Sequence, residues 1–435
     1  MTDEFEAIVT RVPGPRSLEL AATLARTETR GVTYLARDFP VFWKSADGAL
    51  VCDVDDNRYI DCTAAFGVAT TGHANPAVAH AIAEQASLLP HGMGDVHPTE
   101  AKTRLLERLA ALAPLDEPKT FLCSTGGEAI EFALKTAYLA VGEPHVLAFE
   151  GGYHGLGYGA LETCGIARFR EPWRAQLRDT TTFAVFPDPR RSRSAEQSLD
   201  SVAKALKKHA TIGAVMVEPI QGRAGVIVPP DGFLPALREL CTRYGVLLIL
   251  DEIYTGFGRT GTLFACEREG VRPDMLCVGK ALGGGFPISA TILCGDVANA
   301  WQPSTGEALH TSTYLGNPMG CAAALANLDE IARRDIPRLA RERERSIGRA
   351  LRALQEAHAA IVDVRGRGML WAIEFTDASY ATACAVRALA RGLIVLQSGL
   401  GGEAITFAPP PVITEAQLER AFTLLHEVVR DPVLA

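Results

Sequence analysis

Residues 246–252 have the sequence VLLILDE, in which an uninterrupted apolar run ends in two acids. A run that is apolar at nearly every position suits a strand inside a parallel sheet, because helices cover both faces of such a sheet. Glycine or polar residues and a longer segment with helical spacing separate this run from others like it. The other runs are residues 120–124, 145–149, 182–186, 212–217, 275–278 and 290–294. The sequence therefore predicts an α/β fold with a mostly parallel seven-stranded sheet covered by helices.

Outside this region the chain follows two other patterns. Residues 41–62 alternate apolar and polar side chains around turn residues, which predicts an antiparallel meander. A long helical stretch near the C-terminus precedes the strands of a second, α+β unit. Its predicted strands are residues 361–364, 370–375 and 392–397. We expect residues 1–75 and 326–435 to form one smaller domain together, beside a large domain of residues 76–325.

The composition of the 435-residue chain is that of an ordinary globular protein. Hydrophobic residues make up 48% and charged residues 22%, which is too apolar for a disordered chain. The 43 basic and 51 acidic residues give a net charge of −8, without the basic stripe that binding to a phosphate backbone requires. We therefore expect no nucleic-acid partner.

The cysteines and the N-terminal segment bear on the location of the protein. The 10 cysteines are scattered and lack the spacing of metal ligands, which indicates reduced core residues and no bound metal. Residues 1–16 begin acidic, and no apolar run approaches the roughly 20 residues that span a bilayer. We expect a soluble, untargeted, cytoplasmic protein with no membrane partner.

A glycine turn at one strand end is a candidate phosphate site. In open α/β sheets, ligands bind beyond the carboxyl ends of the strands. Gly126 and Gly127 follow the run at residues 120–124 and begin a helical segment. Glycines there let backbone N–H groups approach a phosphate, and a helix N-terminus favours negative charge. The same turn also suits a simple tight connection, so this motif alone leaves both interpretations open.

Three other strand ends carry chemically distinctive side chains. Tyr153 and His154 follow one run, where the aromatic ring either stacks on a planar ligand or packs at a domain interface. Asp251 and Glu252 end another run, and a buried carboxylate there needs a cation or a protonated ring nitrogen as its partner. Lys280 follows a third run. Because lysine is rarely buried in proteins, a lysine at the end of a buried strand indicates a functional role.

These features together point to pyridoxal phosphate. A lysine holds this cofactor as a Schiff base, an acid keeps its pyridine nitrogen protonated, and a helix N-terminus holds its phosphate. A Walker A loop at Lys280 is excluded, because no glycine stands at the required distance upstream and Ala281 replaces the hydroxyl residue. The HExxH and GxSxG patterns of other enzyme classes are absent from the chain.

The motifs around these residues occur in a characteristic order. They are STGGEA, YHG, VEPIQG, DEIYTGFGRTG, GKALGGGFP, HTSTYLGNPMGCAAALA, VRGRGMLWAIEF and ITFAPPPVIT. In this order and spacing the chain resembles the class III pyridoxal-phosphate aminotransferases of fold type I, from about residue 41 to residue 425. The resemblance implies pyridoxal 5'-phosphate as cofactor, bound by the large domain.

The resemblance also implies roles for individual residues. Lys280 matches the Schiff-base lysine, which in this family also moves the proton between the substrate and the cofactor. Asp251 matches the partner of the pyridine nitrogen. Ile253 matches the residue that packs beneath the ring, and Tyr153 the one that stacks above it.

Further matches concern the phosphate and the subunit contact. Gly126 and Gly127 match the phosphate cradle. Thr313 matches a threonine that reaches the phosphate of the neighbouring subunit's cofactor, which implies a homodimer with shared active sites. Glu218 and Gln221 match positions near the cofactor that orient the acid and the ring hydroxyl.

Two departures from the family bear on the substrate. Members that act on ornithine, acetylornithine or 4-aminobutyrate usually carry an acid where this chain has Arg223, and an arginine where it has Thr406. Loss of that arginine removes the usual bidentate grip on an α-carboxylate. Our hypothesis is that Arg223 binds the substrate carboxylate instead. The alternative is that Arg223 faces solvent or pairs with Glu403.

Other departures are expected to shape the substrate pocket. Tyr254 stands where glutamine is frequent, Thr311 stands where glycine is usual, and Gly127 replaces a common hydroxyl residue. The candidates for lining the pocket are Phe66, Trp43, Met93 and Tyr254.

The resemblance implies an aminotransferase that moves an amino group from an amino acid or amine to a keto acid or aldehyde through pyridoxamine phosphate. Both partners are then small molecules. The departure at Thr406 leaves open an amino-acid racemase or epimerase, or an aminomutase, although the sequence identifies no second proton donor opposite Lys280. A cofactor-free binding protein of the same fold is a third interpretation, and the intact Lys280 and Asp251 argue against it.

Overall fold

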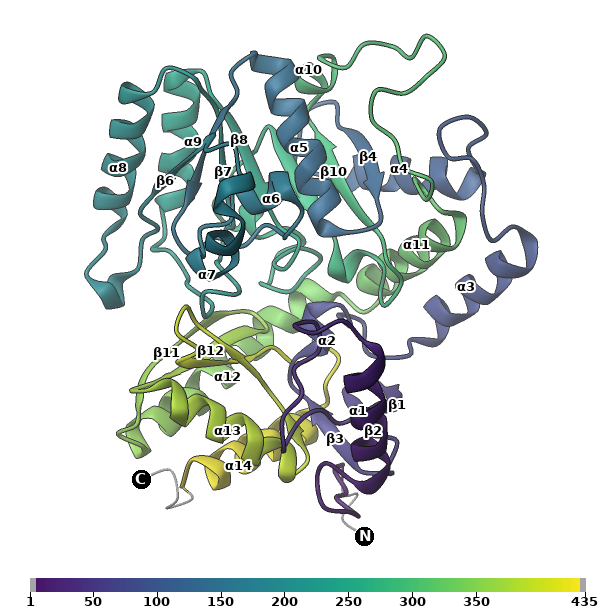
Figure 1. Cartoon of the computed structure of the whole chain (residues 1–435), viewed down its shortest axis with the longest axis vertical. Helices are drawn as coiled ribbons and strands as arrows, with labels where there is room; N and C mark the ends of the chain where they lie inside the picture. The colour runs from purple at the N-terminus through teal and green to yellow at the C-terminus, as the bar shows by residue number, and fades with distance from the viewer. Residues whose placement is uncertain (1–4, 431–435) are drawn as a thin grey trace.

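The computed structural model describes residues 5–430, and its elements form two parts, an upper and a lower one in Figure 1. The strands of the upper part are β4 (Lys119–Cys123), β5 (His145–Phe149), β6 (Thr181–Ala184), β7 (Ile212–Val217), β8 (Leu247–Asp251), β9 (Met275–Val278) and β10 (Ser289–Leu293). They form one seven-stranded sheet in the order β4-β10-β9-β8-β7-β5-β6. β10 runs antiparallel to both of its neighbours, β4 and β9, and the other pairs of this sheet are parallel. This confirms the predicted mostly parallel sheet.

Alternate residues of the central strands pack into two hydrophobic cores. Val215 and Leu250 belong to a core on one face of the sheet. Their chain neighbours Met216 and Ile249 belong to a second core, which includes helix α5 (Gly126–Val141) on the other face. Successive side chains of a strand point to opposite faces, so strands covered on both sides are apolar at every position.

Helices cover this sheet on both sides. They are α3 (Pro76–Leu88), α4 (Glu100–Leu112), α5, α6 (Tyr158–Glu162), α7 (Ala167–Arg170), α8 (Ala195–Lys208), α9 (Phe233–Tyr244), α10 (Gly295–Ala298) and α11 (Pro318–Arg333), with 3-10 helices η1 (Glu171–Gln176), η2 (Pro189–Arg191), η3 (Ala265–Glu269) and η4 (Lys280–Leu282). Within residues 5–430, no helix has both the length and the apolar character needed to cross a membrane.

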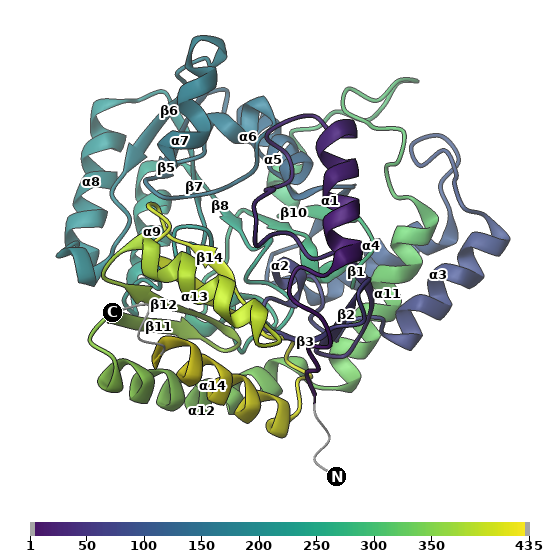
Figure 2. The ribbon, with the colours of Figure 1, turned by 60° about the horizontal axis from the view of Figure 1, so that its bottom comes forward.

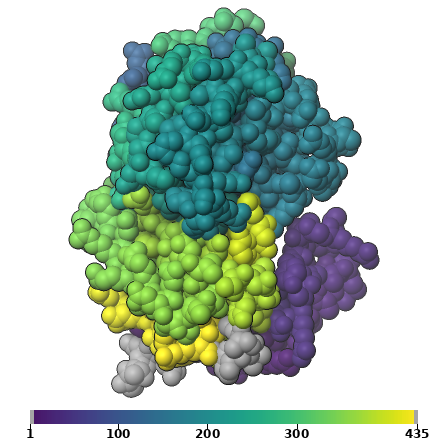
Figure 3. Space-filling model, turned by 90° about the vertical axis from the view of Figure 1, so that its left-hand side faces the viewer, coloured from purple at the N-terminus to yellow at the C-terminus, as the bar shows by residue number. Residues whose placement is uncertain are grey.

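The lower part combines elements from both ends of the chain, as Figures 2 and 3 show. Its first sheet contains β1 (Trp43–Asp47), β2 (Leu50–Asp53), β3 (Arg58–Asp61) and β13 (Leu393–Ile394), and its second contains β11 (Ile361–Arg367), β12 (Leu370–Phe375), β15 (Ala404–Phe407) and β14 (Leu396–Ser398). Its helices are α1 (Pro15–Thr27), α2 (Ala64–Gly67), α12 (Ile336–Ala357), α13 (Ala378–Ala390) and α14 (Glu415–Arg430). β1, β2 and β3 form the predicted antiparallel meander, and β13 extends it by parallel pairing with β3.

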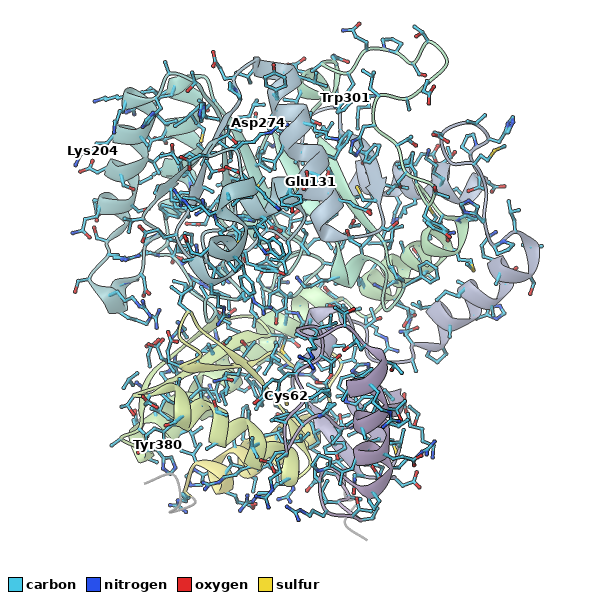
Figure 4. The ribbon with its side chains drawn as sticks, in the orientation of Figure 1. Cys62, Glu131, Lys204, Asp274, Trp301 and Tyr380 are labelled. Carbon is cyan, nitrogen blue, oxygen red and sulfur yellow. The ribbon has the colours of Figure 1, made fainter. Side chains whose placement is uncertain are left out.

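The chain passes from one of these sheets to the other at Val395. The sequence predicts a single strand over residues 392–397, whereas the structure has β13 paired with β3 and β14 paired with β15. Cys62, labelled in Figure 4, lies at this junction: its N–H donates to the carbonyl of Ile394, and its own carbonyl accepts from Ala408. The pairing partners, which lie far away in the sequence, decide where the strand divides.

The domain limits at residues 75 and 326 stay a prediction. The smaller predicted domain includes residues 1–4 and 431–435, which lie outside the described residues.

Candidate functional site

A buried ion pair lies at the carboxyl end of β8. Asp251 is the last residue of this strand. Its Oδ2 accepts a hydrogen bond from Nδ1 of His154 at 2.7 Å, and its Oδ1 accepts one from the N–H of Ile253 at 3.1 Å. Burial alone would lower the pKa of His154, but the hydrogen bond and charge of Asp251 outweigh it, aided by Glu218, so this pKa is raised. The raised pKa favours the protonated imidazole, whose charge balances the carboxylate, as expected for an acid at the end of an apolar strand.

Glu218 lies next to this pair, directly after β7. Its Oε1 accepts from the N–H of Tyr153 at 2.8 Å, and its Oε2 accepts from the N–H of Gly222 at 3.0 Å. Burial raises the pKa of Glu218 to about 7, with His154 opposing this shift and Asp251 adding to it. Glu218 therefore joins two loops of the site through a carboxyl group that titrates near neutral pH.

Lys280 follows β9 with an unusual backbone conformation. Its φ is 40°, in the left-handed region that residues other than glycine rarely adopt. Its Nζ lies 4.8 Å from the centroid of the Tyr254 ring. Burial lowers the pKa of Lys280, Asp251 and Glu218 oppose this shift, and the charge of Arg223 lowers it further. The net lowering increases the neutral fraction of the amine, which is the form that acts as a base or nucleophile.

The N-terminus of α5 presents two backbone N–H groups without a partner. Thr125 caps this helix: its hydroxyl accepts from the N–H of Glu128, whose carboxylate accepts from the N–H of Thr125 in return. In residues 5–430, no hydrogen bond satisfies the N–H of Gly126 or Gly127. An added Cβ on Gly127 would meet open space. The helix start thus offers two donors and the positive end of its dipole to an anion.

Ile253 and Tyr153 lie beside these groups. A Cβ on Gly126 would come within 2.8 Å of Cδ1 of Ile253, and one on Gly279 within 3.5 Å of its Cγ2. Ile253 therefore lies between the glycine turn at the start of α5 and the backbone that follows β9. The Tyr153 ring contacts the ring of Phe169 edge-on, with 5.6 Å between centroids.

Tyr254 connects the site with the N-terminal part of the chain. Its ring lies so close to Gly67 and Gly222 that a Cβ on either glycine would overlap it. Gly67 ends α2, which lies where the two parts of the molecule meet (Figure 1). In the same turn Phe66 has a φ of 61° and is 57% exposed. The structure thus brings Phe66, Tyr254 and Lys280 into one region.

Arg259, near Tyr254, forms hydrogen bonds with several segments that are far apart in the sequence. The side chain is 0% exposed, and burial lowers its pKa to about 10. All the acceptors of its hydrogen bonds are uncharged. They are the carbonyls of Gly67, Met369, Ala408 and Pro409 and the hydroxyl of Thr70.

Arg223 lies on a tight loop in which Gln221 and Ile227 exchange backbone hydrogen bonds of 3.1 and 2.9 Å. Its guanidinium carbon lies 5.0 Å from the ring centroids of both Tyr153 and Phe169. The side chain is exposed to solvent. Arg223 therefore lies at the edge of the site, above two aromatic rings.

Other candidate residues have partners outside this cluster. Thr406 is buried, and its hydroxyl donates to Oγ of Ser398 at 2.8 Å. The amide of Gln221 donates to the carbonyl of Glu150 at 2.8 Å. Thr313 lies on an exposed turn before α11. The functions of these three residues stay predictions.

The remaining candidates lie on the surface or have structural contacts. Trp43 and Met93 are 43% and 54% exposed, and the Trp43 ring meets His73 edge-on. Glu252 is fully buried and accepts from the N–H groups of Ala265 and Cys266, so this acid stabilises a turn. Of the two adjacent acids at the carboxyl end of β8, Asp251 pairs with an imidazole and Glu252 does not.

Comparison with known proteins identifies the family. The family described as aminotransferase class-III matches residues 34–429. An acetylornithine aminotransferase from Methanopyrus kandleri is 39% identical over 392 residues, which cover 90% of this chain and 95% of that protein.

Two solved structures extend the comparison. An amine transaminase from an uncultivated Pseudomonas species, in the PLP-bound form, is 29% identical with a TM-score of 0.84, covering 93% of this chain and 98% of that one. The ornithine aminotransferase from Toxoplasma gondii is 28% identical with a TM-score of 0.84, covering 95% and 94%. The chain belongs to the class-III aminotransferases. Its enzyme class is therefore aminotransferase, and the relatives favour this activity over a racemase or epimerase.

His154 is the residue of the site to which the sequence assigns no role. The signal is present, because an imidazole follows one strand and an unpaired acid ends another at the same sheet edge. Only the structure shows that the two meet.

Proposed function

We propose that this aminotransferase uses pyridoxal 5'-phosphate to move an amino group from an amino acid or amine to a keto acid or aldehyde. When bound, this cofactor supplies a carbonyl that takes up and returns the amino group, and a ring that withdraws electrons. One observation carries the proposal: Lys280, the Asp251–His154 pair and the unsatisfied N–H groups of Gly126 and Gly127 converge at one sheet edge.

The residues present fit this cofactor. The N–H groups of Gly126 and Gly127 would hold the phosphate at the start of a 16-residue helix. Each carboxylate oxygen of Asp251 has a lone pair left after its bonds to His154 and Ile253, so this side chain would accept from a protonated pyridine nitrogen. His154 would keep the negative charge of Asp251 in place.

The two flanking side chains would hold the ring. Ile253 would pack against one face and Tyr153 against the other. Glu218 would fix the loop of Tyr153 through its 2.8 Å hydrogen bond to the backbone, and Gln221 would fix the loop of Glu150. These residues position the ring without taking part in the chemistry.

Lys280 would hold the cofactor and move the substrate proton. Its lowered pKa leaves more of the amine neutral at a given pH, and a neutral amine is required of both a nucleophile and a base. Nζ would take the proton from the substrate carbon that bears the amino group. The left-handed backbone at this residue fixes the direction from which the side chain approaches.

The experiment that tests this function mixes the reconstituted enzyme with single amino acids and amines in deuterated solvent, without an acceptor. Acetylornithine is the first donor, because a relative is named for it. The expected result is conversion of the cofactor to its amine form, which is monitored through the absorption spectrum of the cofactor. An unchanged spectrum with deuterium entering the α-position and decaying optical activity would contradict it and indicate a racemase.

We also propose a cytoplasmic homodimer as the functional unit. Thr313 would reach the cofactor phosphate in the partner's site. Its neighbours Tyr314 and Leu309 are 61% and 82% exposed, which suits a surface that a second copy covers. Sedimentation velocity of the holoenzyme is expected to give a dimer. A fully active monomer would contradict the proposal.

A further inference from the structure

Arg223 is an exposed cation that has no acidic partner. In residues 5–430, no carboxylate lies within ion-pair distance of its guanidinium. The two acids next to its loop are occupied. Glu403 pairs with Arg191 at 3.0 Å, and Glu150 pairs with Arg193 at 2.9 Å. The positive charge of Arg223 is therefore available to a ligand.

Two aromatic rings hold this guanidinium in place. Its carbon lies 5.0 Å from the ring centroids of Tyr153 and Phe169, a distance at which a cation and an aromatic face attract. Contact with two rings restricts the side chain, and within residues 5–430 no hydrogen bond from its N–H groups is seen. A guanidinium ordered in this way loses less entropy when it forms two parallel hydrogen bonds to a carboxylate.

The backbone that carries Arg223 is also anchored. Its carbonyl accepts from the N–H of Gly399 at 3.2 Å, and Arg365 donates to the carbonyl of Val226 at 3.1 Å. Gly225 and Val226 both have positive φ values, of 101° and 53°, which close the loop tightly. The backbone position of Arg223 is thus set by contacts with the C-terminal part of the chain.

Arg223 also lies within electrostatic reach of the reacting amine. Its charge contributes to lowering the pKa of Lys280, and it opposes the rise that burial causes in the pKa of Tyr153. Thr406 itself carries no charge, and its hydroxyl donates to Oγ of Ser398. A substrate carboxylate near Lys280 would therefore meet Arg223.

We propose that Arg223 binds a carboxylate of the amino donor or of its carbonyl acceptor. The substrates of the enzyme are then amino acids and keto acids, in preference to simple amines and aldehydes. This inference rests on the proposed function, since it assigns a substrate class to the same site.

The first test measures binding without turnover. Glutarate has two carboxylates and no amine or carbonyl, so its titration into the holoenzyme by calorimetry reports on carboxylate binding alone. Arg223→Ala is expected to weaken this binding about 10- to 100-fold, and Arg223→Lys by less, because a lysine keeps the charge but lacks the bidentate edge. No glutarate binding to the unmodified enzyme, or equal affinity in Arg223→Ala, would overturn the proposal.

Arg168 provides the matched control. Its guanidinium carbon also lies 5.0 Å from the Phe169 ring, and it is exposed, so Arg168→Ala removes the same charge from the same ring. We expect its glutarate affinity to stay within about twofold of the original. An equal loss in both variants would overturn the assignment to Arg223, because general attraction would then explain the binding.

The second test separates this inference from the proposed function. Butylamine lacks the carboxylate that 4-aminobutyrate carries, and each is offered as donor with the cofactor spectrum as readout. Arg223→Ala is expected to raise KM about 10- to 100-fold for the donor with the carboxylate and to leave KM unchanged for butylamine. Equal effects on both donors would overturn the inference alone. If none of the donors converts the cofactor of the unmodified enzyme to its amine form, the proposed function fails. The glutarate titration then still tests whether Arg223 binds a carboxylate.

Discussion

Nδ1 of His154 lies 2.7 Å from Oδ2 of Asp251, and the two side chains are only 1% and 5% exposed. In an interior of low polarity, the two opposite charges stabilise each other, whereas either one alone would be costly. The charge at this strand end is therefore a property of the pair. A substitution of one member therefore changes the protonation equilibrium of the other.

Asp251→Asn is expected to lower kcat by about 10³-fold while the cofactor stays bound. A neutral amide holds no proton on the pyridine nitrogen and no longer balances His154. The measurement is kcat together with cofactor occupancy from absorbance. His154→Gln keeps the acid and serves as the comparison, with a smaller loss and a shifted pH profile. Nearly full activity in Asp251→Asn would assign the acid partner to another residue.

Lys280→Ala is expected to abolish turnover and leave the fold intact, because we propose that the side chain acts at the reacting atoms and not as a packing residue of the core. The circular dichroism spectrum and the elution volume should match those of the unmodified enzyme. Lys204→Ala on α8 is the matched control, since this lysine is exposed on a helix of the upper part (Figure 4). Substantial transamination by Lys280→Ala would remove the proposed role.

Glu218→Gln tests whether the stability of the protein depends on the protonation of this buried acid. The pKa of Glu218 is about 7 in the folded protein and near 4.5 in the unfolded chain. Its contribution to stability is thus fully present below pH 4.5 and is lost as the pH rises to 7. The free energy of unfolding in urea should fall over this range by about 1–3 kcal/mol more in the unmodified enzyme than in Glu218→Gln. The same difference between the two proteins at both ends of this pH range would contradict the prediction.

Arg259→Met is expected to lower the free energy of unfolding by about 3–5 kcal/mol, because it leaves several buried acceptors without a donor. Urea denaturation measures this loss. Arg272→Met is the control, since its ion pair with Asp116 is exposed and should contribute less than about 1 kcal/mol. Equal stability of the two variants would show that the hydrogen bonds of Arg259 are dispensable.

The large sheet could be predicted because its signal is local. Runs such as residues 212–217 are apolar at every position only when both faces are buried, and each of the seven runs forms a strand. The sequence also places the acid, the lysine and the glycine turn at one edge of the sheet, since parallel strands bring their carboxyl ends together. Sequence order is sufficient for this part of the site.

The contacts that span the molecule could not be predicted in this way. Nothing near Val395 indicates that the strand divides there, because no glycine or proline interrupts residues 393–397 and the division depends on the pairing partners. The approach of Tyr254 to Gly67 depends on how two distant segments pack. The same holds for Arg223, whose aromatic neighbours Tyr153 and Phe169 come from the segment between β5 and β6.

The parallel pairing of β3 with β13 has a consequence for biosynthesis. The N–H of Ile60 donates to the carbonyl of Gly392, a residue that the ribosome adds about 330 residues later. Until then, one edge of the N-terminal meander has no partner, and Ile60 and Cys62 lack the apolar neighbours that bury them in the finished protein. We expect the newly made N-terminal segment to depend on a chaperone until translation is nearly complete.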